Sequence, residues 1–85
     1  MKLCIISEFT CNFSDYKAMI EGRRDEVMQY CMEMTLAQVS EHKSIMVADV
    51  TDPTGLQAHM STPEAQQWDK DNGCVDIVYT MESVS

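Results

Sequence analysis

Residues 33–51 read EMTLAQVSEHKSIMVADVT, and this stretch decides how the rest of the chain is organised. Its first half alternates loosely between apolar and polar residues, and its second half is rich in β-branched residues, which is typical of strands. A polar break at 41–43 has the length of a hairpin turn, although it lacks the glycine or asparagine of an ideal one. We therefore predict an antiparallel hairpin that pairs residues 35–40 with residues 44–50.

A further strand is predicted at 2–9 (KLCIISEF), ahead of the hairpin in the chain. Cys4 and Ile6 fall on one of its alternating faces, and Leu3 and Ile5 fall on the other. A strand that is apolar on both faces is expected to be covered on both.

A helix is predicted between this strand and the hairpin. Asn12 is a good N-cap, and Asp15 stands where a capping box places its acid. Residues 23–26 (RRDE) are expected to form a solvated face. An apolar stripe follows helical spacing and continues as far as Cys31. Its members are Phe13, Tyr16, Ile20, Val27 and Cys31.

The remainder of the chain predicts a helical region in two pieces and a last strand. Pro53 favours the start of the first piece, and Pro63 interrupts it with Thr62 as a new N-cap. The second piece is expected to stop at Gly73, a C-cap glycine. Residues 74–81 (CVDIVYTM) then alternate as a strand.

Together these elements predict an α+β fold with the ferredoxin-like order β-α-β-β-α-β, in which a four-stranded antiparallel sheet carries its helices on one face. We expect residues 1–85 to form a single domain, because 85 residues allow no more. The other sheet face would then be a broad apolar patch. A second copy of the same sheet would cover it, which predicts a homodimer with an isologous sheet-on-sheet contact.

The composition is that of a globular, acidic protein, with 45% apolar and 24% charged residues and a net charge of −8. This charge repels phosphate backbones and anionic lipids, so we expect neither a nucleic acid nor a membrane as partner. The first ten residues carry Glu8 and no small-residue cleavage site, unlike a signal peptide. A cytoplasmic location is therefore expected.

Cysteines stand at positions 4, 11, 31 and 74, and none of the spacings is a C-x-x-C. We expect reduced thiols packed as small hydrophobes and no metal site. If a disulfide did form, Cys4 and Cys74 would be the first pair to examine, on the assumption that they lie on adjacent strands.

The segment 55–64 (GLQAHMSTPE) resembles the second-helix signature of the dimeric α/β-barrel superfamily. Antibiotic-biosynthesis monooxygenases there often carry an A-x-x-H-L-x-S-P-H type run, and Glu64 stands here where many members have a second histidine. The layout of elements matches over nearly the whole chain. The resemblance implies the ferredoxin-like fold and the dimer. It leaves the chemistry open among monooxygenases, haem-degrading enzymes, isomerases and proteins without known activity.

His59 is the candidate catalytic residue. It lies between Leu56 and Met60 on the helical segment that covers the sheet, and the resemblance implies a cavity between helices and sheet. A histidine that projects into this cavity could shuttle a proton or ligate haem iron. The alternative is a half-buried structural histidine bonded to a backbone carbonyl.

Four aromatic side chains are candidate ligand-binding residues for a flat aromatic ligand: Trp68, Tyr16, Tyr79 and Phe13. The alternative for the single tryptophan is a core contact between helix and sheet. In haem-degrading members of the superfamily, an asparagine, a tryptophan and a histidine form the working set. Their order here differs from the family's, so haem degradation is a minor alternative and no cofactor is expected.

Two functions from different classes remain. The first is a small homodimeric protein that binds a small apolar or aromatic ligand between helices and sheet. The second is a cofactor-independent monooxygenase or isomerase, in which His59 handles a proton and Tyr16 or Trp68 holds the substrate.

Overall fold

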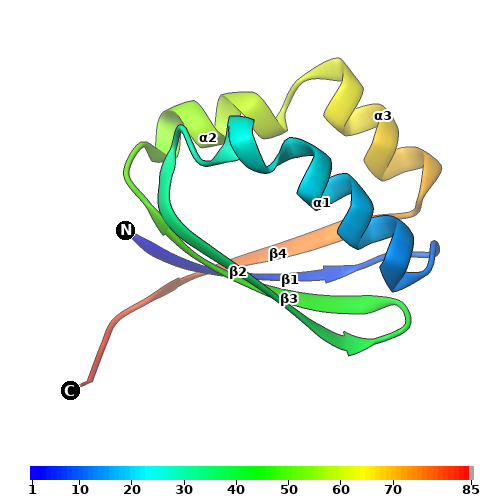
Figure 1. The fold of residues 1–85 in the computed structure, drawn as a ribbon, viewed down its shortest axis with the longest axis horizontal. Helices are drawn as coiled ribbons and strands as arrows, with labels where there is room; N and C mark the ends of the chain where they lie inside the picture. The colour runs from blue at the N-terminus through cyan, green and yellow to red at the C-terminus, as the bar shows by residue number, and fades with distance from the viewer. Residues whose placement is uncertain (85) are drawn as a thin grey trace.

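A computed structural model describes residues 1–84 as a four-stranded sheet with helices on one of its faces (Figure 1). The elements are β1 (Lys2–Glu8), α1 (Phe13–Val27), β2 (Cys31–Ser40), β3 (Lys43–Val50), α2 (Pro53–Met60), α3 (Pro63–Asp71) and β4 (Val75–Met81). The strand order is β2-β3-β1-β4, and every neighbouring pair is antiparallel. The predicted ferredoxin-like arrangement is confirmed, with the second helical region divided in two.

Side-chain caps start α1, α2 and α3, and those of α1 and α3 are the caps that the sequence predicts. Asn12 Oδ1 accepts from the backbone N–H of Asp15 at 2.8 Å, and Thr62 Oγ1 accepts from that of Ala65 at 3.2 Å. At α2, Asp52 Oδ1 accepts from the N–H of Gly55 at 3.0 Å. Each cap satisfies a donor that the first helical turn leaves free.

The end of α1 differs from the prediction. The helix ends at Val27, and Cys31 is the first residue of β2, where it pairs with Val50. The extension of the helical stripe to Cys31 was therefore wrong. The carbonyl of Tyr30 accepts from the N–H groups of Thr51 and Asp52 at 2.8 and 3.2 Å, which ties the chain to the start of α2. Cys31 owes its burial to the sheet, although its spacing from Val27 is also that of a helix.

The hairpin is longer than predicted, because β2 already begins at Cys31. Leu36 faces Met46 in the register, and Ser40 pairs with Lys43. The register shifts between Gln38 and Ser40, just before the turn. A bulge of this kind supplies the extra twist that the turn residues do not provide.

The sheet separates two different environments. On the helix side, Ile5, Met46 and Leu56 are buried in the core. On the opposite side, Val47 and Ile77 are 40% and 52% exposed. The single chain thus buries one sheet face and leaves an apolar surface on the other.

Candidate functional site

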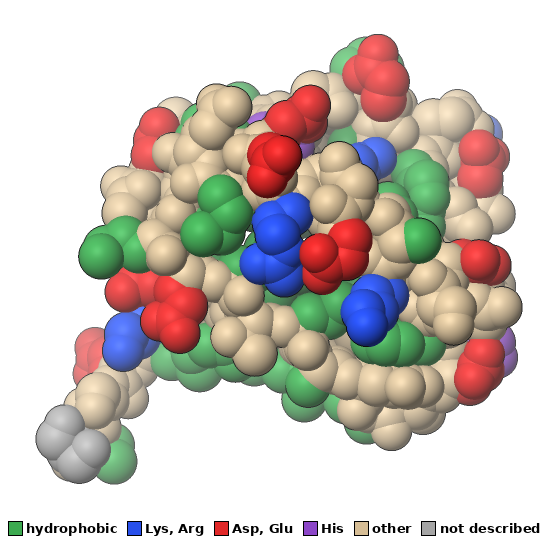
Figure 2. Space-filling view, viewed as in Figure 1, with side chains coloured by type: hydrophobic (Ala, Val, Ile, Leu, Met, Phe, Trp, Pro, Cys, Tyr) green, Lys and Arg blue, Asp and Glu red, His purple; other side chains and the backbone are tan. Residues whose placement is uncertain are grey.

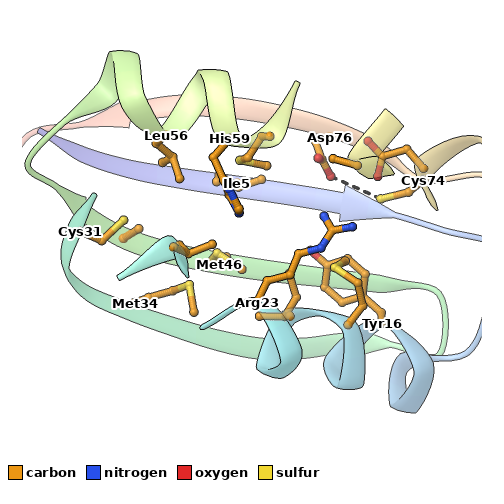
Figure 3. A pocket seen from close by; sticks show the side chains of 17 residues that line it. Ile5, Tyr16, Arg23, Cys31, Met34, Met46, Leu56, His59, Cys74 and Asp76 are labelled. Carbon is orange, nitrogen blue, oxygen red and sulfur yellow. Dashed lines mark hydrogen bonds between the residues drawn. The ribbon is translucent and has the colours of Figure 1, made fainter. Parts of the chain in front are cut away.

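A cavity of about 60 Å³ lies between the helices and the sheet (Figure 3). Aliphatic and methionine side chains from α1, α2, β1, β2 and β3 form most of its wall. Four of the eight methionines take part, namely Met19, Met34, Met46 and Met60. The more polar side chains of the wall are Tyr16, Arg23, His59, Asp69, Cys74 and Asp76.

One end of the cavity carries a hydrogen-bonded chain that crosses from α1 to β4. The hydroxyl of Tyr16 donates to Ser7 Oγ at 3.1 Å, and Ser7 Oγ donates to Asp76 Oδ1 at 2.6 Å. Tyr16 and Ser7 are buried, whereas Asp76 lies on the exposed edge strand. Burial raises the pKa of Tyr16, so its hydroxyl stays protonated and acts as a donor at neutral pH.

Two further acidic groups lie at the same end. Cys74 Sγ donates to Asp76 Oδ1 at 3.5 Å, and burial followed by the charges of Asp76 and Asp69 raises the pKa of the thiol. Burial, and then the charge of Asp76, also raises the pKa of Asp69. Cys74 is therefore a protonated thiol rather than a nucleophilic thiolate.

His59 stands at the other side of the cavity, where it bridges two helices. Its side chain is 19% exposed, and Nε2 lies 3.6 Å from Glu26 Oε2 of α1. Nε2 is buried without a hydrogen bond among the described residues, and no backbone carbonyl there accepts from the ring. The imidazole also lies beside Tyr30, with ring centroids 6.0 Å apart. The alternative role of His59, that of a structural histidine bonded to a backbone carbonyl, is therefore not seen among these contacts.

Arg23 and His59 form the rim of the cavity. Both also line a second, outer hollow of about 290 Å³, together with Glu26, Thr62 and Glu64. In Figure 3, His59 extends from α2 and Arg23 from α1 toward the same space. A molecule could therefore place an apolar part inside and a polar part between these two side chains.

The four aromatic candidates do not meet in one wall. Of the four, only Tyr16 lines the cavity. Trp68 is not part of the wall, and its ring centroid lies 6.1 Å from that of Tyr16. Phe13 lines a separate groove between α1 and β2. Tyr79 pairs with Cys4, on the sheet face away from the helices, and is 50% exposed.

The sequence interpretation missed Arg23, which it placed on a solvated face. Arg23 follows Tyr16 by seven residues and Met19 by four, a spacing that puts all three on one side of a helix. This spacing could have identified it. Asp69, Cys74 and Asp76 come together where α3 ends and β4 begins: the N–H of Cys74 donates to the carbonyl of Asp69 at 2.8 Å, and Cys74 and Asp76 are two residues apart. The alternation of residues 74–76 could have indicated that Cys74 and Asp76 share a face.

The cysteines and the described acidic groups do not form a metal or disulfide site. All four cysteines are free. Cys74 directly precedes β4, which is the neighbour of β1, but Cys4 pairs with Tyr79 there, so the two cysteines do not face each other. Within residues 1–84, no three His, Cys, Asp or Glu side chains gather closely enough to hold a metal ion.

The same part of the chain holds no helix with the length and apolarity to cross a membrane.

The fold is shared with several solved structures. SnoaB, a cofactor-independent oxygenase from Streptomyces nogalater, superposes with a TM-score of 0.63 at 10% identity over 98% of this chain and 95% of that one. An antibiotic biosynthesis monooxygenase gives 0.63 at 18% identity, and Rv0793 from Mycobacterium tuberculosis gives 0.61 at 12%, both over the full length of each chain. No protein-family model and no curated protein matches the sequence. At these identities the likeness establishes the fold.

Proposed function

We propose that this protein binds a small, largely apolar molecule between its helices and its sheet. The observation that carries the proposal is the cavity itself, an apolar space with a few polar side chains set into its wall. Such a combination of apolar wall and sparse polar groups is the usual construction of a ligand site. Tyr16 and His59 are the two candidates from the sequence that line it.

The volume limits the size of the molecule. A buried cavity of about 150 Å³ is needed to hold a benzene molecule, and the cavity here measures about 60 Å³. A single aromatic ring therefore requires movement of the methionine side chains or use of the outer hollow, and methionine adapts readily. Single-ring compounds fit this description better than polycyclic ones.

Methyl NMR of ¹³C-labelled methionine tests the proposal with toluene as the probe. The resonances of Met19, Met34, Met46 and Met60 should shift on titration, because these four side chains line the cavity. Met1 and Met32 are internal controls, since they are 61% and 72% exposed. Shifts confined to Met1 and Met32, or none at all, would contradict the proposed site.

A second candidate function is that of a cofactor-independent oxygenase, favoured by His59 Nε2, which is buried in the wall without a hydrogen bond. His59 would take a proton from an activated methylene group, and Tyr16 would hold the substrate. Dioxygen would oxidise the resulting carbanion, so that one oxygen atom enters the product as a carbonyl and the other leaves as water. The fold shared with SnoaB supports this candidate.

An oxygen electrode with a panel of activated single-ring substrates tests it. His59→Gln should abolish oxygen uptake and leave the toluene-induced methionine shifts in place. General-base catalysis typically raises a rate by about 10²–10⁴-fold, so the fall in the rate of oxygen uptake should be easy to measure. Turnover that survives in the variant would exclude His59 as the base.

We also propose that the protein is a homodimer through the sheet face that the helices leave open. Val47, Ile77 and Tyr79 are all at least 40% exposed on this face. A contiguous apolar surface of this kind is unusual on a stable monomer. A second copy offers the same surface and so completes a self-complementary contact.

A further inference from the structure

Arg23 is the one lysine or arginine among the described residues that lines the cavity, and its charge lowers the pKa of Asp69 without forming an ion pair with it. Within residues 1–84, its guanidinium makes no hydrogen bond or ion pair. The adjacent Arg24 behaves differently, since it binds Glu21 through two bonds of 3.1 and 3.2 Å. Arg23 is half-buried and points into the space that it shares with His59 (Figure 3).

Two of the acidic groups around Arg23 are engaged elsewhere. Asp76 accepts from Ser7 and Cys74, and Glu26 lies against His59. Asp69 lines the cavity without forming an ion pair with Arg23, and Glu64 is exposed in the outer hollow. Figure 2 shows basic side chains over α1 set among acidic ones, and the net charge of the chain is −8, so an anion finds little general attraction on this face. Any anion held here must be held by Arg23 locally.

A cation beside an apolar space lacks much of the hydration that stabilises it in water, and an anionic partner compensates for this lost stabilisation. The proposed proton transfer creates such a partner. When a neutral acid in the cavity loses its proton to His59, the negative charge left behind lies in surroundings of low dielectric. Stabilisation of developing charge is commonly the largest contribution to catalysis.

We propose that Arg23 binds the conjugate base of the ligand, and that the ligand is a small weak acid such as a phenol, an enol or a β-dicarbonyl compound. The O–H or C–H bond breaks, an N–H bond forms on His59, and the resulting oxyanion pairs with the guanidinium of Arg23. This inference rests on the proposed function, because it concerns the same cavity. It narrows the ligand from apolar molecules in general to ionisable ones.

The bound pKa of 4-nitrophenol tests the inference, because the absorbance of this phenol reports its ionised fraction directly. Burial by itself would raise the pKa of the bound phenol, as it raises the pKa of Tyr16 and Asp69 in the same wall. The effect of Arg23 is therefore a decrease measured against the Arg23→Met variant: the phenol should ionise at a pH about 1 unit lower in the wild type, since a charge of opposite sign within a few ångströms shifts a pKa by 1–3 units. Arg23→Lys should keep part of this decrease. Arg24→Met is the matched control and should retain the decrease in full.

Binding of 4-nitrotoluene, a neutral compound of nearly the same shape, separates the two proposals. If 4-nitrotoluene shifts the cavity methionines but the bound phenol ionises as readily in Arg23→Met as in the wild type, the role of Arg23 is overturned and the apolar site stands. An equal loss in Arg24→Met would show a diffuse charge effect and would also overturn the role of Arg23. If neither compound shifts the methionines, the proposed function itself fails.

Discussion

The hydroxyl of Tyr16 donates a 3.1 Å hydrogen bond to Ser7 Oγ and so joins the buried side of α1 to the central strand β1. The ring of Tyr16 stacks on Phe9 at a centroid distance of 4.4 Å and an interplanar angle of 6°. Ser7 in turn donates to Asp76 on β4. The consecutive elements β1 and α1 and the distant strand β4 are thereby fixed around one end of the cavity.

We predict that Ser7→Ala destabilises the protein more than Tyr16→Phe. The first change removes the Ser7 hydroxyl, which accepts from the buried phenol and donates to Asp76, at a cost of about 1–3 kcal/mol, whereas the second removes only the phenol donor, at about 1 kcal/mol. Denaturant unfolding of both variants and of the double variant measures the difference. Additive effects in the double variant would contradict a direct interaction.

Two glycines should respond in opposite directions to alanine. A Cβ on Gly22 would meet nothing within 4 Å, so Gly22→Ala should stabilise α1 by about 1 kcal/mol. A Cβ on Gly55 would stand 2.5 Å from Asp52 Oδ2 and 2.7 Å from the ring of Tyr30. Gly55→Ala should therefore disturb the cap of α2 and cost about 1–3 kcal/mol. Thermal unfolding of the pair checks the sign of each effect.

The raised pKa of Asp69 predicts a dependence of stability on pH. A carboxyl whose pKa is higher in the folded state than in the unfolded state favours folding below the ordinary aspartate range near pH 4. This contribution is lost as the pH rises through the folded pKa, since the buried group must then ionise. Asp69→Asn should therefore raise the melting temperature at pH 7 and have little effect at pH 3.

Asp25→Asn is the control for this prediction, because Asp25 is exposed on α1. A gain of the same size at pH 7 in the control would show that reduced net negative charge, rather than burial of Asp69, is the cause.

The proposed dimer predicts a particle of about twice 9.7 kDa in sedimentation at micromolar concentration. Ile77→Lys should convert it to a folded monomer, because Ile77 lies on the open sheet face and is 52% exposed in the single chain. Gln57→Lys, on the exposed side of α2, should leave the dimer intact. A wild-type protein that sediments as a compact monomer would exclude the sheet-on-sheet contact.

The sequence predicted those features of the fold that depend on a few neighbouring residues. Asn12 and Thr62 cap the helices as expected, and Gly73 takes a positive φ of 56° after α3. Each signal is local, since a cap or a turn is satisfied within a single turn of chain. The end of α1 was not predictable in this way, because Cys31 continues the helical spacing from Val27 and only the pairing with Val50 makes it a strand residue.

By itself, the sequence determined the order of the elements, the starts of the helices and the apolar faces they bury. Only the tertiary structure decided which side chains meet. Ser7 and Asp76 are joined across 69 positions of sequence, and Arg23 and His59 face one cavity from different helices. Such contacts between distant side chains depend on strand register and on how the helices pack. A shift of one residue in register would move every side chain of a strand to the opposite face.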